Sequence, residues 1–96
     1  MKRLENKVAV ITGGADGLGR AAALKFSAAG ATVIIWDMNE EKGLLTVSEI
    51  EAAGGKACFE KVNTASFTEV EAATKNATAK FGRIDILINN AGITRD

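Results

Sequence analysis

The sequence predicts an α/β fold in which a parallel β-sheet is covered by helices on both faces. Short apolar runs rich in β-branched residues alternate with longer Ala- and Leu-rich segments, and a glycine cluster directly follows the first apolar run. Four strands joined by connections of a dozen or more residues require parallel pairing and right-handed crossovers. We expect residues 1–96 to form the first half of a doubly wound sheet, in the order 3-2-1-4.

The first strand and the first helix lie on either side of the glycine cluster. Residues 8–12, with the sequence Val-Ala-Val-Ile-Thr, predict a buried strand. Residues 20–29 are rich in Ala and Leu and predict a helix, which Gly30 is placed to end.

The second strand and the second helix follow. Residues 32–37 are apolar almost throughout, which is typical of a strand covered on both faces. Residues 40–53 predict a helix that ends at the glycine pair 54–55. Gly43 inside this helix is expected to be a weak point, because glycine costs about 1 kcal/mol relative to alanine in a helix interior.

The third strand, residues 56–62, has a shorter apolar run and is more polar than the first two, so it is expected near an edge of the sheet. Ser66 and Glu69 then have the spacing of a capping box, in which each side chain satisfies a free backbone donor at a helix start. The third helix is expected to run to about Phe81, with Gly82 at its carboxyl end.

Residues 84–89 predict a fourth, apolar strand. If no further strand paired with it, residues 84–88 would form an exposed apolar edge that invites pairing with another chain. We therefore expect a homo-oligomer, and a marginal or aggregating product if the 96 residues are isolated.

Composition excludes several classes of function. Twelve Lys and Arg balance twelve Asp and Glu, so the chain carries no charge pattern for nucleic acid or an anionic membrane. No apolar stretch approaches a membrane span, and no signal peptide is recognisable, so a cytoplasmic protein is expected. With no His and only Cys58, neither a zinc site nor a Ser-His or Cys-His nucleophile can be assembled, and no metal is expected.

The glycine cluster predicts a site for a diphosphate. Glycines 13, 17 and 19 allow positive φ angles and let phosphates approach the backbone without meeting a Cβ. The helix beyond offers unpaired N–H groups and the positive end of its dipole. The alternative is a tight strand-to-helix turn that binds nothing. The setting of strand, loop, helix and strand favours the phosphate site.

Asp37 at the end of the second strand indicates which dinucleotide is bound. A carboxylate there can accept hydrogen bonds from the adenosine ribose hydroxyls and repels a 2′-phosphate. Asp16 adds negative charge nearby, and the residues after Asp37 are not basic. NAD is therefore predicted in preference to NADP. The alternative is that Asp37 is only the polar end of a strand or a helix cap.

Two motifs resemble the short-chain dehydrogenase/reductase family. Residues 12–19 match its T-G-x-x-x-G-x-G cofactor loop, and residues 89–92 match its N-N-A-G signature at the end of the fourth strand. The resemblance covers essentially the whole chain and implies a Rossmann-type fold. Residues 89–96 are similar to the same segment of bacterial β-ketoacyl-acyl-carrier-protein reductases. Many of those use NADPH and carry a basic residue at the position of Asp16.

The resemblance also implies roles for individual residues. Asn63 stands where the family often has Asp, so an acceptor is kept and a charge is lost. With Asp16 added from its place in the loop, the predicted cofactor-binding residues are Gly13, Asp16, Gly17, Leu18 and Gly19 along the pyrophosphate and nicotinamide side, Asp37 at the adenine ribose, Val62 and Asn63 at the adenine, Asn90, Ala91 and Gly92 at the nicotinamide ribose, and Thr12 tying the loop to the N-N-A-G turn.

By resemblance the reaction is hydride transfer between the nicotinamide and a carbonyl or secondary alcohol, with an acyl thioester as one possible substrate. The family uses a Tyr acid assisted by a Lys four residues later and by a Ser. This chain contains no Tyr, so no residue in it is predicted to be catalytic, and the 96 residues alone are expected to be inactive. The alternatives are a non-catalytic module that binds the dinucleotide, or an interaction domain that uses the edge of the fourth strand.

Overall fold

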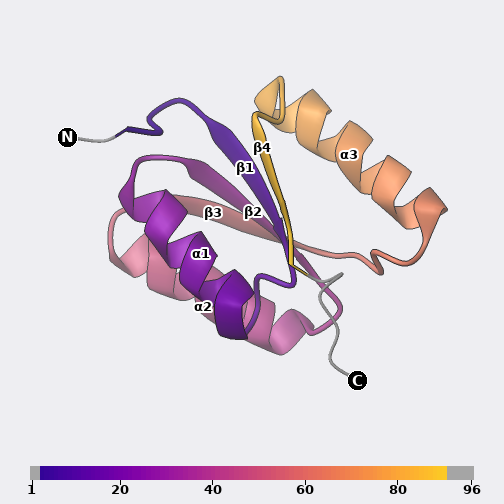
Figure 1. Cartoon of the computed structure of the whole chain (residues 1–96), viewed down its shortest axis with the longest axis horizontal. Helices are drawn as coiled ribbons and strands as arrows, with labels where there is room; N and C mark the ends of the chain where they lie inside the picture. The colour runs from indigo at the N-terminus through magenta and orange to yellow at the C-terminus, as the bar shows by residue number, and fades with distance from the viewer. Residues whose placement is uncertain (1–2, 91–96) are drawn as a thin grey trace.

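A computed structural model describes residues 3–90 of the chain, and its central feature is a four-stranded sheet (Figure 1). The sheet has the order β3-β2-β1-β4, and every neighbouring pair is parallel, as the sequence predicts. The strands are β1 (Val8–Thr12), β2 (Thr32–Asp37), β3 (Lys56–Lys61) and β4 (Ile86–Asn89). β3 and β4 lie at the two edges of the described sheet.

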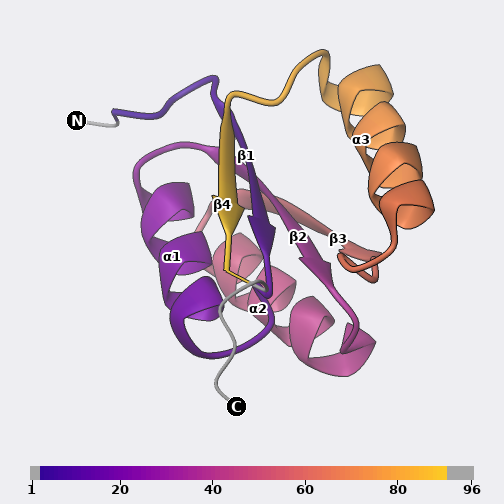
Figure 2. The same cartoon turned by 45° about the vertical axis from the view of Figure 1, so that its right-hand side comes forward.

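Three helices cover the two faces of the sheet. α1 (Gly17–Ala28) and α2 (Glu40–Ala52) lie side by side on one face, and α3 (Phe67–Phe81) lies on the other (Figures 1 and 2). None of these helices, within residues 3–90, is long and apolar enough to cross a membrane.

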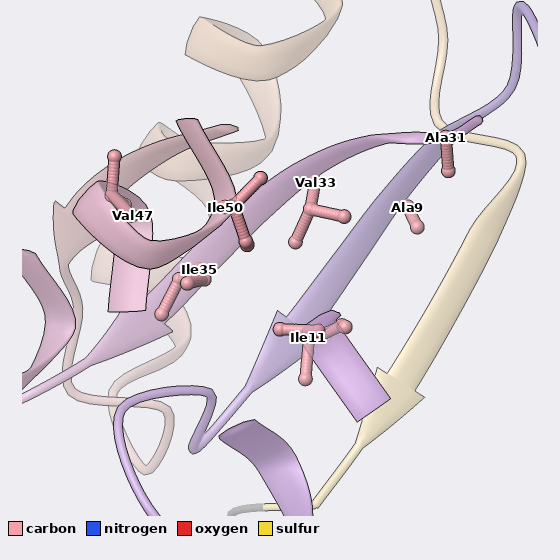
Figure 3. Close-up of a cluster of buried hydrophobic side chains, with 8 residues drawn as sticks. Ala9, Ile11, Ala31, Val33, Ile35, Val47 and Ile50 are labelled. Atoms are coloured by element: carbon pink, nitrogen blue, oxygen red, sulfur yellow. The ribbon is translucent and has the colours of Figure 1, made fainter. Parts of the chain in front are cut away.

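Side chains alternate along the strands, so the sheet has one core on each face. Ala9, Ile11, Val33 and Ile35 of β1 and β2 form one core with Val47 and Ile50 of α2 (Figure 3). Ala23 of α1 belongs to the same core. On the opposite face the core consists of Val8, Val10, Ile34, Trp36, Val62, Ala73 and Ala77. Both cores are almost wholly aliphatic, and both hold the ends of β1 and β2 at fixed positions.

The start of α1 differs from the prediction. The helix begins at Gly17 rather than at Arg20, because the Asp16 side chain caps it by accepting a hydrogen bond from the Gly17 N–H at 2.8 Å. The predicted end near Ala29 is confirmed within one residue. The glycine cluster therefore contributes residues to the first turn of the helix as well as to the loop.

Only one of the two hydrogen bonds of the predicted capping box is present at the start of α3. Ser66 Oγ accepts the Glu69 N–H at 3.2 Å, as predicted. The Glu69 carboxylate, however, accepts the N–H of Asn63 at 2.8 Å rather than that of Ser66. It thereby holds the loop that leaves β3, and Gly82 ends the helix in the left-handed conformation as expected.

Gly43 has a role that helix propensity does not reveal. A Cβ at this position would lie 2.2 Å from Cε1 of Phe59 on β3. The glycine lets α2 approach the edge strand closely enough for the Phe59 ring to lie against the helix backbone. Packing therefore gives a reason for a glycine here that helix propensity alone does not, and the predicted weak point stays a prediction.

The beginnings of β1 and β4 are joined by the Asp85 side chain. Asp85 Oδ2 accepts the Val8 N–H at 2.8 Å, and Asp85 N–H donates to the Val8 carbonyl at 2.9 Å. Arg83 Nε also donates to this carboxylate, at 2.9 Å. The Val8 N–H, aided by Arg83, lowers the pKa of Asp85 below its usual range. β4 itself starts at Ile86, two residues later than predicted.

Candidate functional site

The polar residues singled out from the sequence gather at the carboxyl edge of the sheet. Thr12, the last residue of β1, is in register with Trp36 on β2 and with Asn89 on β4. Asp37 follows Trp36, and the glycine loop starts directly after Thr12. In open parallel sheets a ligand binds in the crevice outside the carboxyl ends of the strands, which is where these residues lie.

The three glycines singled out from the sequence, Gly13, Gly17 and Gly19, serve two different purposes. Gly13 and Gly17 have φ angles of 68° and 58°, a conformation that side chains disfavour. A Cβ on Gly17 would meet nothing within 4 Å, so this side of the loop is open. A Cβ on Gly19 would instead lie 1.9 Å from the Gly13 carbonyl oxygen. Gly19 is thus required by the close approach of helix and loop, and not by a positive φ as predicted.

The first turn of α1 presents backbone donors to the same open side. The Arg20 N–H donates to the Asp16 carbonyl at 3.2 Å and makes the first backbone hydrogen bond of the helix. The N–H groups of Leu18 and Gly19 precede that bond, so they cannot be satisfied within the helix. Together with the helix dipole they form a site suited to an anion. The Leu18 side chain beside them is 74% exposed.

The Asp37 carboxylate holds the loop in place. Its Oδ2 accepts the Ala15 N–H at 3.1 Å, and its Oδ1 accepts the Asn39 N–H at 2.9 Å. The carboxylate therefore ties the end of β2 to the glycine loop and to the segment that caps α2. Each oxygen keeps lone-pair capacity for a further donor. The alternative role as a polar strand end and the predicted role in a site are compatible.

An open pocket of about 320 Å³ lies beside Asp37. Val62 and Asn63 line this pocket together with Asp37, as the resemblance implies. The Asn63 carboxamide oxygen already accepts the Ala65 N–H at 3.0 Å, so the acceptor kept at this position partly serves the loop itself. The pocket is lined by Gly13, Trp36, Asp37, Met38, Val62, Asn63, Thr64 and Ala65.

The end of β4 is joined to the glycine loop by side chains. Thr12 Oγ1 lies 3.1 Å from Asn89 Oδ1 and 3.3 Å from the Ile88 carbonyl oxygen. Asn90 Nδ2 reaches the Gly13 carbonyl oxygen at 3.4 Å. The predicted tie between Thr12 and the start of the N-N-A-G segment is present. Ala91 and Gly92, the other predicted residues of that segment, lie outside the described residues.

Asp16 has a partner that the sequence analysis did not identify. Lys42 Nζ on the first turn of α2 donates to Asp16 Oδ2 at 3.0 Å. This bond, with the Gly17 N–H, lowers the pKa of Asp16. The negative charge that Asp16 adds near Asp37 is therefore paired with a cation. No local pattern in the sequence marks this contact, because Asp16 and Lys42 lie 26 residues apart and meet through the packing of α1 beside α2.

Trp36 was also missed as a residue of the site. It precedes Asp37 on β2, is 3% exposed and lines the pocket beside Asp37. Its indole Nε1 has no hydrogen-bond partner within residues 3–90. Over the same range no group of three or more His, Cys, Asp or Glu is arranged to hold a metal ion.

Comparison with known proteins shows which family this chain is similar to. Residues 7–96 match the family model described as short chain dehydrogenase. A 3-oxoacyl-acyl-carrier-protein reductase of Thermotoga maritima is 44% identical over 94 residues, which are 98% of this chain and 38% of that protein. A 3beta-hydroxysteroid dehydrogenase of Mediterraneibacter gnavus is 39% identical over 97% of this chain and 34% of its own length.

A solved structure shows the same fold. The crystal structure of a metagenomic short-chain oxidoreductase in complex with NADP superimposes with a TM-score of 0.90 at 37% identity, over 94% of this chain and 41% of that one. The chain thus spans well under half the length of the relatives that it matches.

Proposed function

The chain belongs to the short-chain dehydrogenase family, and from that premise we propose that residues 1–96 are the cofactor-binding part of an NAD-dependent oxidoreductase. The enzyme moves a hydride between the nicotinamide and a carbonyl or secondary alcohol. Family membership supports the reaction type, and the geometry of the carboxyl edge supports the part that this chain plays in it.

The observation that carries the proposal is the hydrogen bond between Asp37 and Ala15. It brings a carboxylate at the end of β2 to the glycine loop, whose Gly17 has open space where a Cβ would stand. A diphosphate needs bare backbone and free N–H donors, and an adenosine ribose needs an acceptor one strand away. The residues present therefore fit a dinucleotide.

Each part of the cofactor has residues to hold it. The N–H groups of Leu18 and Gly19 bind the diphosphate, Asp37 accepts from the adenosine ribose hydroxyls, and Val62 and Asn63 face the adenine. Asn90, Ala91 and Gly92 border the nicotinamide ribose, while Thr12 and Asn89 fix the distance between the two halves of the site. When bound, the cofactor supplies or accepts the hydride.

The preference for NAD rests on Asp37. A 2′-phosphate would bring two negative charges beside this carboxylate, whereas a ribose hydroxyl donates to it. The metagenomic relative solved with NADP belongs to the same family, so the preference belongs to individual residues and not to the fold. Asp37 is the residue that we hold responsible in this chain.

The substrate is proposed only by class. The printed activities of the relatives concern a 3-oxoacyl thioester in one case and a hydroxysteroid in another. Both are pairs of a carbonyl and a secondary alcohol, and a 3-oxoacyl thioester is the narrower proposal. Because this chain contains no Tyr, the acid that protonates the substrate oxygen comes from elsewhere in the enzyme, and residues 1–96 alone bind without catalysing.

The edge of β4 supports association. β4 pairs with β1 on one side only within the described sheet, and Leu87 is 59% exposed. An uncovered apolar edge favours pairing with further strands or with a second copy. We include a homo-oligomer in the proposal on this ground.

Titration with NADH tests the proposal directly. Trp36 is the single tryptophan, and its emission overlaps the absorption of a dihydronicotinamide, so bound NADH should quench it by energy transfer, saturably at micromolar NADH. Asp37→Ala, which leaves Trp36 in place, is the control and should bind more weakly. If NADH did not bind saturably to the chain, the proposed function would be contradicted. Binding by the chain without oxidation of NADH by a 3-oxoacyl thioester is the result expected for the isolated chain.

A further inference from the structure

Both backbone polar groups of Ala15, in the glycine loop, are held by side chains from other elements. The Ala15 N–H donates to Asp37 Oδ2 at the end of β2, at 3.1 Å. The Ala15 carbonyl oxygen accepts from Thr46 Oγ1 on α2, at 3.3 Å. Ala15 is 4% exposed and Thr46 is 1% exposed, so the contact between them is buried. The loop is therefore fixed at this residue by α2 as well as by β2.

The Thr46 hydroxyl has a second acceptor within its own helix. Thr46 Oγ1 also lies 3.2 Å from the carbonyl oxygen of Lys42, four residues earlier. In an α-helix that carbonyl already accepts the backbone N–H of Thr46, so it is satisfied without the hydroxyl. The Ala15 carbonyl is buried against α2, where losing a donor is costly. The hydroxyl bond is shared between the two acceptors, and its Ala15 branch joins α2 to the loop.

The position of Ala15 in the loop gives this contact a consequence for the site. Ala15 directly precedes Asp16, the cap of α1, so the orientation of its carbonyl sets how the chain enters the first helical turn. That turn carries the N–H groups of Leu18 and Gly19 that are proposed to bind the diphosphate. Glycine allows many backbone conformations, so a loop rich in glycine needs such a fixed point. A site held in its binding geometry loses less conformational freedom when the ligand binds.

We infer that Thr46 is a positioning residue for the dinucleotide, and that it acts through the Ala15 carbonyl. The inference rests on the proposed function and adds to that site a residue from the buried face of α2. Because Thr46 is almost fully buried, it does not touch the cofactor. Its hydroxyl keeps the glycine loop in the conformation that presents the free N–H groups to the diphosphate.

Thr46→Val tests this role, because valine has nearly the shape of threonine and lacks the hydroxyl. The variant is expected to bind NAD⁺ about threefold to tenfold more weakly, the scale of one neutral hydrogen bond. Thr46→Ser keeps the hydroxyl and should restore the affinity to within about twofold of the parent. A purely structural role of the side chain would not produce this recovery of affinity.

Thr74→Val is the matched control. Thr74 Oγ1 on α3 donates to the Val70 carbonyl at 2.8 Å, four residues earlier, so it makes the same bond within its helix that Thr46 makes with Lys42. α3 lies on the other face of the sheet from α1 and α2 (Figure 2). The control should change the NAD⁺ affinity by less than about twofold.

The deciding measurement is calorimetric titration of NAD⁺ into the full chain and its variants, with urea unfolding of each variant in parallel. The inference predicts weaker binding by Thr46→Val, recovery in Thr46→Ser and no change in Thr74→Val. If Thr46→Val lost stability but kept its NAD⁺ affinity, Thr46 would only support the fold and the inference would be overturned.

A second pair of variants keeps the test decisive if Thr46→Val does not fold. Thr46→Ala and Thr46→Ser differ from each other only by the hydroxyl, and the Ala variant should bind NAD⁺ more weakly by a similar factor. Equal affinity of this pair, or failure of both variants without a hydroxyl to fold, would also overturn the inference. Those results leave the NAD site intact, whereas a parent chain that does not bind NAD⁺ contradicts the proposed function itself.

Discussion

The Asp37 carboxylate lies 3.1 Å from the Ala15 backbone nitrogen and accepts its hydrogen bond, so one side chain joins the end of β2 to the glycine loop. The same carboxylate accepts the Asn39 N–H at the cap of α2. A residue proposed to bind the ribose therefore also positions the loop that binds the diphosphate. These two roles can be separated by experiment.

Asp37→Ala should weaken NAD binding by roughly 1–3 kcal/mol, the range for a lost charge-assisted hydrogen bond, and should narrow the difference between NAD and NADP. Asp37→Asn keeps an oxygen for the Ala15 N–H but loses the charge. It should narrow the difference to a similar extent with a smaller loss of loop stability. Calorimetric titration of both dinucleotides measures the effect, and unchanged selectivity in both variants would remove Asp37 from the site.

Gly17→Ala and Gly19→Ala should fail in different ways. A Cβ on Gly17 would stand in the open space proposed for the diphosphate, so the main loss is expected in NAD affinity. The left-handed φ adds a smaller loss of stability, roughly 1–2 kcal/mol. A Cβ on Gly19 collides with the Gly13 carbonyl, so the main loss is expected in the free energy of unfolding. Urea unfolding and NAD titration of both variants check this, and equal stability of the two would refute the separation.

Gly43→Ala should destabilise the fold by about 1–3 kcal/mol although alanine is the better helix former, because its Cβ would overlap the Phe59 ring. Urea unfolding measures the change. Combining it with Phe59→Leu should cost less than the sum of the two single changes. A more stable Gly43→Ala variant would show that propensity outweighs the contact.

Acid should weaken the junction between β1 and β4. The pKa of Asp85 is lowered in the folded chain, chiefly by the Val8 N–H, so its contribution to stability is present above the unfolded value and is lost as the pH falls below about 4. The difference in melting temperature between the parent and Asp85→Asn should therefore be largest near neutral pH and should shrink below about pH 4. A difference that did not vary with pH would contradict this.

The strands and their order could be predicted from the sequence because β1 is an apolar run that ends at the glycine loop, and β2 is an apolar run that begins shortly after Gly30. Local signals failed where a partner distant in the sequence decides the outcome. Gly43 looks unfavourable until Phe59 is placed against it. The charge of Asp16 looks free until Lys42 is brought beside it.

In the candidate site, too, local patterns predicted some residues and missed one that only tertiary packing reveals. The glycine motif and Asp37 marked its position, and the strand order brought Val62 and Asn63 to the pocket. Trp36 was overlooked because one residue of alternation places it on the other face of the sheet from Asp37, and only the three-dimensional arrangement shows that it lines the same pocket.

A crystal structure of the chain grown with NAD⁺ tests the central claim most directly. The account predicts a diphosphate within hydrogen-bond distance of the Leu18 and Gly19 N–H groups, with the adenosine ribose hydroxyls donating to Asp37. A dinucleotide bound away from the glycine loop, or a ribose that does not contact Asp37, would contradict it.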